Sequence, residues 1–332
     1  MVQSTPHLAF KFRFVQDGQA RGLRSKSASA DATALDLDGE QLRYEDIVDT
    51  SSQDKRLILA LAPTAQLGAK TAKAFQKERF LVLDVQGVQV RDLELHIDRF
   101  SSAIAAERHR QDLVAAGDEA LYRVVVCPNC GATIGLSKLE RTRYVYCRYC
   151  ESVLDKGEGM VFLGDGYRVC SECQFFGRVQ GYTIFNFYFL IIVYSVSYGR
   201  RYLCDACAVR QAKRALLRNF IFLLGIPSAV YMWVRAVTGH EPELKELSQA
   251  NALARKGKSR EADAIYGRLM IRYPEHPGLL LNQSVGHFQG GDDQEGFEYL
   301  NRSLRACSNY VPALQLVQRL QRMAEQTGTG AG

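Results

Sequence analysis

The sequence Cys127-Pro-Asn-Cys130 is followed by Cys147-Arg-Tyr-Cys150, and the same pattern recurs as Cys170-Ser-Glu-Cys173 and Cys204-Asp-Ala-Cys207. Eight of the nine cysteines therefore fall into four C-x-x-C pairs. In a reducing compartment such pairs are typical of metal binding rather than of a disulfide framework. We expect the first two pairs to hold one ion and the last two pairs to hold another.

The ligands that we predict for the first ion are Cys127, Cys130, Cys147 and Cys150. Each pair forms a tight knuckle, and a hairpin with 144–146 as its return strand brings the two knuckles together. This module, at 121–155, resembles a zinc ribbon. Four thiolates at ~2.3 Å complete a tetrahedral shell and leave no position for a water or substrate, so we expect structural Zn²⁺. A redox dithiol is the alternative, but four pairs in two sets favour metal.

The ligands that we predict for the second ion are Cys170, Cys173, Cys204 and Cys207, in a module at 165–210. An uncharged run, YTIFNFYFLIIVYSVSY at 182–198, separates the two pairs. A helix of this length would carry the chain ~25 Å, about the thickness of a bilayer core, whereas the four sulfurs must converge. The run must therefore fold back, as a β-hairpin or a membrane-dipping loop, and its composition favours strand. An apolar insertion between C-x-x-C pairs is similar to the LITAF-like domain, which implies anchoring on a membrane face.

Residues 209–238 form a basic amphipathic and then apolar segment. Arg210, Arg214 and Arg218 occupy one helical stripe, and the apolar run FIFLLGIPSAVYMWV follows at 220–234. This order is typical of a membrane interface or a tilted span. Two buried helices packed on the second zinc module are the alternative.

We therefore expect a membrane surface to contact 182–198 and 209–237, with Tyr231 and Trp233 near the far boundary. A single span at 220–237 stays open as a further interpretation, although its apolar run is shorter than the ~20 residues of a typical span and contains a proline. The first thirty residues lack the features of a secretory signal. We expect a cytoplasmic protein associated with the inner face of the cytoplasmic membrane.

Residues 1–115 have the pattern of a β-rich domain closed by a helix. Large apolar residues alternate along Leu8–Phe14, which indicates a half-buried strand. Further strands are expected near 33–37, 41–47, 56–62 and 79–85, and a helix over 92–113. This order of elements resembles the pleckstrin-homology-like fold. Lys11 and Arg13 could meet an acidic lipid headgroup, but the solvent face of an edge strand is the favoured interpretation.

From 241 to 326 the pattern is helical and repeats. Aligning Gly257 with Gly291 gives a period of 34 residues, and this also aligns the small residues Ala250 and Ser284. The period resembles the tetratricopeptide repeat. That resemblance implies antiparallel helix pairs with a groove for a protein or peptide partner. Two repeats are fewer than the three usually needed, so we expect a capping helix at 311–325 or a neighbouring domain to cover the exposed face.

The sequence gives no sign of an enzyme. It contains no nucleotide-binding, zinc-protease, hydrolase or kinase signature, and its six histidines lack ligand or triad spacing. We expect His287 to have a packing role and Cys307, the unpaired cysteine, to be a small buried hydrophobe.

These patterns predict a multidomain α+β protein. Its parts are a β-rich amino-terminal domain with a closing helix, two four-cysteine zinc modules and a carboxy-terminal all-α helical-repeat domain. The function that follows is a non-catalytic zinc-binding scaffold or adaptor that binds a protein through its repeats at the membrane face, with two structural Zn²⁺ ions. The alternative is a zinc-ribbon nucleic-acid-binding protein, which is not favoured because the basic residues cluster beside apolar ones rather than along the ribbon.

Overall fold

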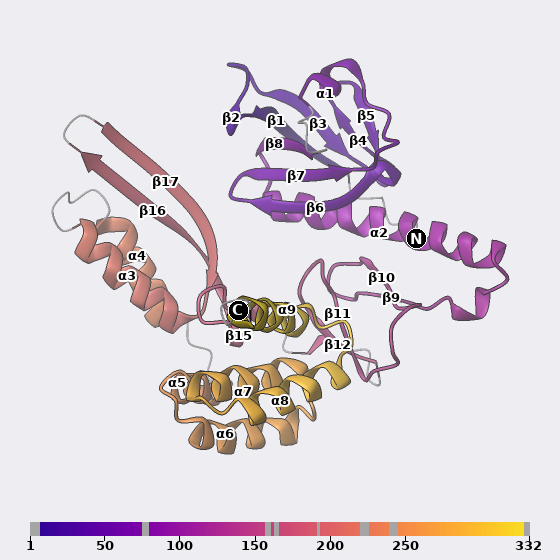
Figure 1. Cartoon of the computed structure of the whole chain (residues 1–332). Helices are drawn as coiled ribbons and strands as arrows, with labels where there is room; N and C mark the ends of the chain where they lie inside the picture. Colours follow the sequence, from indigo (N-terminus) through magenta and orange to yellow (C-terminus); the bar gives the residue numbers. More distant parts are fainter. Residues whose placement is uncertain are drawn as a thin grey trace. The chain divides into compact units, whose positions relative to one another are not determined.

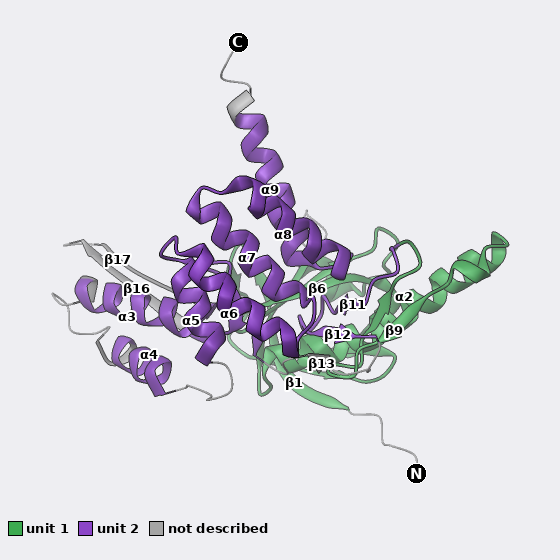
Figure 2. Cartoon of the chain, turned by 90° about the horizontal axis from the view of Figure 1, so that it is seen from below, with its two compact units in different colours: residues 1–138 green, residues 139–332 purple. Residues whose placement is uncertain are grey.

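The computed structural model describes residues 7–74, 80–156, 161–162, 166–190, 193–219, 226–238 and 245–328. The chain divides into two compact units, residues 1–138 and 139–332, each with its own hydrophobic core (Figures 1 and 2). The first unit is mainly β-sheet and the second contains most of the helices. The fold is therefore mixed, as the sequence predicts.

The first unit is built on an antiparallel half-barrel sheet (Figure 1). Its strands are β1 (Leu8–Gln16), β2 (Gln19–Ala20), β3 (Lys26–Ala30), β4 (Ala34–Leu37), β5 (Glu40–Arg43), β6 (Ile47–Gln53), β7 (Arg56–Leu61) and β8 (Phe80–Gln86). They follow the order β5-β4-β3-β1-β8-β7-β6, with β2 paired to β1. Helices α1 (Ala69–Ala74) and α2 (Val90–Ala115) accompany the sheet, and α2 buries Leu93 and Ile97 in its core.

The alternation in β1 places Phe10, Phe12 and Phe14 in the core. The predicted strands near 33–37, 56–62 and 79–85 and the predicted helix are confirmed. The single strand expected at 41–47 is wrong, because a short 3-10 helix at Tyr44–Asp46 separates β5 from β6. The expectation of an edge strand is wrong, because β1 lies between β3 and β8. Arg13 forms an ion pair with Asp84 of β8 at 2.7 Å, so the neighbouring strand supplies its partner.

A buried acidic pair lies where α2 meets β6. Glu94 and Asp98 are one helical turn apart, and the hydroxyls of Ser52 and Thr50 donate hydrogen bonds to them. Arg91 also pairs with Glu94 at 2.8 Å. Burial raises the pKa of Asp98 to about 7, and the charge of Glu94 acts in the same direction. Asp98 is therefore a group whose protonation couples folding to pH.

Asp98→Asn is expected to flatten the pH dependence of the first unit's stability. Because the folded-state pKa lies above the unfolded one, the folded state binds the extra proton between about pH 4 and pH 7, and stability falls as pH rises through that window. The loss is about 2–4 kcal/mol, and the neutral amide avoids it. Calorimetry of the full chain at pH 5 and pH 8 measures the difference. Asp112→Asn, at an exposed position of α2, is the control, and equal pH slopes in both variants would contradict the assignment.

Three short hairpins and a long one flank the cysteine pairs. The strands are β9 (Val124–Val126), β10 (Thr133–Gly135), β11 (Tyr144–Tyr146), β12 (Val153–Asp155), β13 (Val161–Phe162), β14 (Tyr167–Val169), β15 (Phe176–Arg178), β16 (Gln180–Leu190) and β17 (Val193–Leu203). Strands β16 and β17 pair antiparallel from Gln180↔Leu203 to Leu190↔Val193 (Figure 1). The prediction that the apolar run folds back as a β-hairpin is confirmed.

Seven helices follow in the described part of the second unit. They are α3 (Asp205–Asn219), α4 (Ile226–Thr238), α5 (Lys245–Ala254), α6 (Ser259–Arg272), α7 (Pro277–Gly290), α8 (Asp293–Ala306) and α9 (Val311–Gly328). Among the residues that the structure describes, no helix has the length and apolarity that a membrane crossing requires. Residues 220–225 of the predicted apolar segment and 241–244 of the predicted repeats lie outside the described residues.

Helix α5 packs against α6, and α7 packs against α8. The bounds of α6 and α8 are offset by 34 residues at both ends, which is the period of the sequence pattern. Gly257 and Gly291 follow the first helix of each pair with φ of +73° and +80°, a conformation that glycine adopts without strain. A Cβ on Gly286 of α7 would lie 3.1 Å from the Cβ of Ala254 on α5, so small residues permit this close approach.

Candidate metal centres

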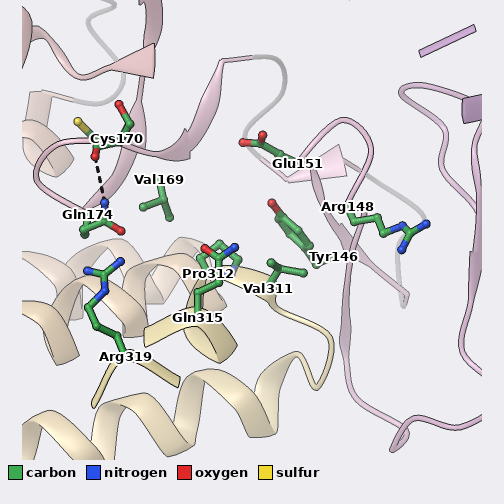
Figure 3. Close-up of a pocket in the computed structure, with 11 residues that line it drawn as sticks. Tyr146, Arg148, Glu151, Val169, Cys170, Gln174, Val311, Pro312, Gln315 and Arg319 are labelled. Carbon is green, nitrogen blue, oxygen red and sulfur yellow. Dashed lines mark hydrogen bonds between the residues drawn. The ribbon is translucent and has the colours of Figure 1, made fainter. Parts of the chain in front are cut away.

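Three of the four C-x-x-C pairs form the same knuckle. The backbone N–H after each second cysteine donates to the carbonyl of the first, from Gly131 to Cys127 at 2.8 Å, Glu151 to Cys147 at 2.7 Å and Gln174 to Cys170 at 3.0 Å. The last of these bonds is drawn in Figure 3. The three donors have φ of +75°, +64° and +63°, so each knuckle closes through a left-handed residue. This closure turns both cysteine side chains of a pair towards one point.

Gly131→Ala is expected to destabilise the first knuckle by about 1–2 kcal/mol, because a side chain is strained at positive φ. The added Cβ would also lie 3.0 Å from Nε of Arg99 on α2. Gly135→Ala in β10 is the matched control, since its φ is ordinary and a Cβ there has open space. Thermal unfolding and chelator competition measure both effects, and equal behaviour of the two variants would refute the role of the left-handed turn.

The fourth pair lies at the start of α3. Cys204 immediately precedes the helix, Cys207 lies in its first turn, and the N–H of Ala208 donates to the carbonyl of Cys204 at 2.9 Å. Free N–H groups and the helix dipole favour thiolates at this end of a helix. The second site thus combines a knuckle with a helix amino terminus, and β16–β17 connects the two halves.

The eight predicted cysteines converge into the two predicted groups. Within each group the four sulfur atoms lie within 4.8 Å of one another. The sulfurs of Cys173 and Cys204 are 3.7 Å apart. A tetrahedron with metal–sulfur bonds of ~2.3 Å has edges of about 3.8 Å, whereas a disulfide would need ~2.05 Å. Both groups can therefore hold a metal ion, and four thiolates form a site that suits zinc.

Two arginines face the sulfurs of the second site. The guanidinium of Arg210 lies 3.1 Å from the sulfur of Cys207, and that of Arg255 on α5 lies 3.7 Å from Cys173 and 3.8 Å from Cys204. Zinc held by four thiolates would carry two net negative charges, which these two cations would partly offset, since Arg210 also pairs with Glu172. Burial alone would lower the pKa of Arg255, but the thiolates of Cys204 and Cys173 outweigh this and raise it. The charge balance fits an occupied thiolate site.

Hydrogen bonds among the four thiols also separate their pKa values. Cys173, Cys204 and Cys207 donate to Cys170, which lowers the pKa of Cys170 far below that of an ordinary thiol. The backbone N–H of Cys204 adds a further donor to this sulfur at 3.4 Å. The thiolate is the form that binds metal, so donors directed at the sulfur of Cys170 favour metal binding.

Two asparagines of the helices bind the segment that follows the third knuckle. Asn282 of α7 accepts from the N–H of Phe176 at 2.5 Å and donates to its carbonyl at 2.8 Å. Asn251 of α5 donates to the same carbonyl at 3.0 Å, and the hydroxyl of Tyr266 orients Asn251. The ring of Phe176 packs over Gly278, where any Cβ would clash at 2.5 Å. The second cysteine module and the helices thus share one buried network.

A third asparagine binds the second knuckle in the same manner. Asn309, between α8 and α9, accepts from the N–H of Tyr146 at 2.9 Å and donates to its carbonyl at 2.8 Å. The rings of Tyr146 and Tyr310 meet edge to face at 5.3 Å. Tyr146 and Phe176 belong to the same apolar core as the buried side chains of these helices.

The sequence does not reveal these contacts. Asn251 and Asn282 are 31 residues apart, so the 34-residue period does not align them, and nothing local marks Arg255 as a partner of the sulfurs. The expected burial of Cys307 is confirmed, and His287 is also buried. His287 shares a 2.8 Å hydrogen bond with Asp263, and its ring stacks on Tyr299.

Comparisons with known protein families, with curated proteins and with solved structures find no match to this chain.

Proposed function

We propose that this protein is a non-catalytic scaffold, stabilised by two structural zinc ions, that holds a protein partner on its helical region. The observation that carries the proposal is the shared network in which Asn282 and Asn309 bind the backbone of Phe176 and Tyr146. Metal sites that are joined to helices by such hydrogen bonds stabilise the shape of a binding surface. They do not form a reaction centre. Closed four-thiolate shells support the same reading, since they offer no position for a substrate.

The helices support an interaction role through their resemblance to tetratricopeptide repeats. Their pairs follow the 34-residue offset and turn at Gly257 and Gly291. Repeats of this kind offer extended surfaces to protein partners. In this chain, however, Phe176 already fills the surface between Asn251 and Asn282. A partner must therefore bind on another part of the helical region.

A cavity of about 450 Å³ lies beside α9, between two of the knuckles (Figure 3). Its walls are Tyr146, Arg148, Glu151, Val169, Cys170, Ser171, Gln174, Val311, Pro312, Gln315 and Arg319. Apolar side chains lie between Arg319 on one side and Arg148 on the other (Figure 3), and Glu151 pairs with Arg168 at 3.6 Å. These features favour an extended protein segment that carries an apolar side chain and an acidic residue.

Capture of partners with the zinc-loaded full chain, followed by cross-linking at the cavity, tests this function. Arg319→Glu should abolish capture, while Arg322→Glu, a matched reversal at an exposed position of α9 outside the cavity, should retain it. Equal capture by both variants would reject the cavity as the partner site. Salt-sensitive retention of nucleic acid in place of protein would favour the nucleic-acid alternative.

A further inference from the structure

Helix α4 has its large apolar residues on the outside. It buries Ala229, Met232 and Ala236, which are small or flexible residues on one stripe. The exposed large residues are Val230 at 43%, Tyr231 at 65%, Trp233 at 44%, Val234 at 45% and Val237 at 47%. A surface helix of a water-facing domain shows the reverse pattern, with polar residues outward. A contiguous apolar face of this kind marks an interaction site.

Helix α3 packs against α4 and supplies positive charge (Figure 1). The two helices contain five basic residues, Arg210, Lys213, Arg214, Arg218 and Arg235, and one acid, Asp205. Arg210 and Arg214 also pair with Glu172 at 3.3 Å and 3.7 Å, while Lys213 is exposed. The helix pair that bears the apolar face therefore carries a net positive charge, which complements an anionic surface.

The β16–β17 hairpin contacts both helices. Its sequence carries no charge from Tyr182 to Tyr198. A two-stranded hairpin leaves unpaired backbone groups at both edges, so it cannot cross the hydrocarbon of a bilayer, but it can lie at the headgroup boundary. Tryptophan and tyrosine prefer that same boundary, where one part of the ring is apolar and the other is hydrated.

We propose that α4, with α3 and the hairpin, docks this protein on the surface of an anionic lipid bilayer. Trp233, Val234 and Val237 enter the boundary between headgroups and acyl chains, and Lys213 contacts acidic headgroups. A protein partner is disfavoured because exposed aromatic and aliphatic residues on a basic helix pair match the charge and the layering of a lipid surface. This surface is separate from the cavity at α9, so the inference goes beyond the proposed function.

The fluorescence of Trp233 tests the proposal directly, because it is the single tryptophan of the chain. Zinc-loaded full chain is titrated with vesicles of phosphatidylcholine alone or with added phosphatidylserine. The emission should shift to the blue, and bromine-labelled acyl chains should quench it, with the anionic vesicles only. Val234→Asp should weaken partitioning at least tenfold, and Lys213→Glu should weaken it about tenfold through lost attraction to acidic lipid.

Ile271→Asp is the matched control, since Ile271 is 80% exposed on α6 and should not touch lipid. Three results would overturn the proposal: no shift or quenching with either vesicle, equal loss in Val234→Asp and Ile271→Asp, or a shift that depends on protein concentration without lipid. A concentration-dependent shift without lipid would indicate that the apolar face of α4 binds a second copy of the chain. Val234→Asp should still capture the partner of the α9 cavity, so failure of one proposal can be told from failure of the other.

Discussion

Cys173→Ser should lower the zinc content from two ions to one and should unfold the helical region together with the third knuckle. Apparent binding free energies of structural zinc are about 10–16 kcal/mol in zinc-finger peptides, and that energy is folding energy. In this chain Arg255 faces the sulfur of Cys173, and Asn251 and Asn282 hold the segment that the knuckle positions. Loss of the ion should therefore spread into α5 and α7.

Hydrogen exchange of the full chain measures how far the unfolding spreads. Amides of α5 and α7 should lose their protection in Cys173→Ser. They should keep it in Cys307→Ser, which alters the one cysteine outside the two clusters. If α5 and α7 keep their protection in a chain that has lost the second ion, these helices fold independently of the second cysteine module. That result would contradict the role given to the hydrogen bonds of Asn251 and Asn282.

Asn282→Ala should cost about 2–4 kcal/mol of unfolding free energy. The side chain is fully buried, and the change leaves both the N–H and the carbonyl of Phe176 without this partner. Each buried polar group that loses its hydrogen bond costs about 1–3 kcal/mol, and Asn251 still serves the carbonyl. Urea unfolding followed by circular dichroism gives the value.

Asn301→Ala provides the matched comparison, because it makes the same change at an exposed position of α8. It should shift stability by less than about 0.5 kcal/mol, as surface substitutions usually do. A similar small effect from Asn282→Ala would mean that the hydrogen bonds to Phe176 contribute little to the packing of the helices against the second cysteine module. Faster hydrogen exchange of the Phe176 amide in Asn282→Ala, but not in Asn301→Ala, would support a role for these hydrogen bonds.

The metal groups and the hairpin were predictable because both follow from local rules. The spacing of Cys127 to Cys150 and of Cys170 to Cys207 defines which sulfurs can share an ion. Convergence of the second group then requires the insertion to fold back, and its composition favours strand over a membrane-dipping loop, which agrees with the β16–β17 hairpin. In the first unit, alternation along β1 and the helical spacing of α2 were enough to place those elements.

The remaining features depend on contacts between distant residues, which no local pattern contains. The place of β1 inside the sheet depends on pairing with β8, about seventy positions later in the chain. Asn282 and Phe176 are 106 residues apart, and Asn309 and Tyr146 are 163 apart. The outward apolar face of α4 is also hidden in the sequence, because periodicity marks a stripe without saying which side is buried.

The zinc content and thiol state of the purified chain, measured together by native mass spectrometry, test the central claim most directly. We predict two zinc ions per chain and no disulfide, with the eight paired cysteines protected from alkylation until a chelator is added. Cys307 is buried, and burial raises its pKa to about 12, so its thiol should react slowly. Because this slow reaction does not depend on metal, adding a chelator should not change it. One zinc ion, or none with the cysteines joined as disulfides, would contradict the account.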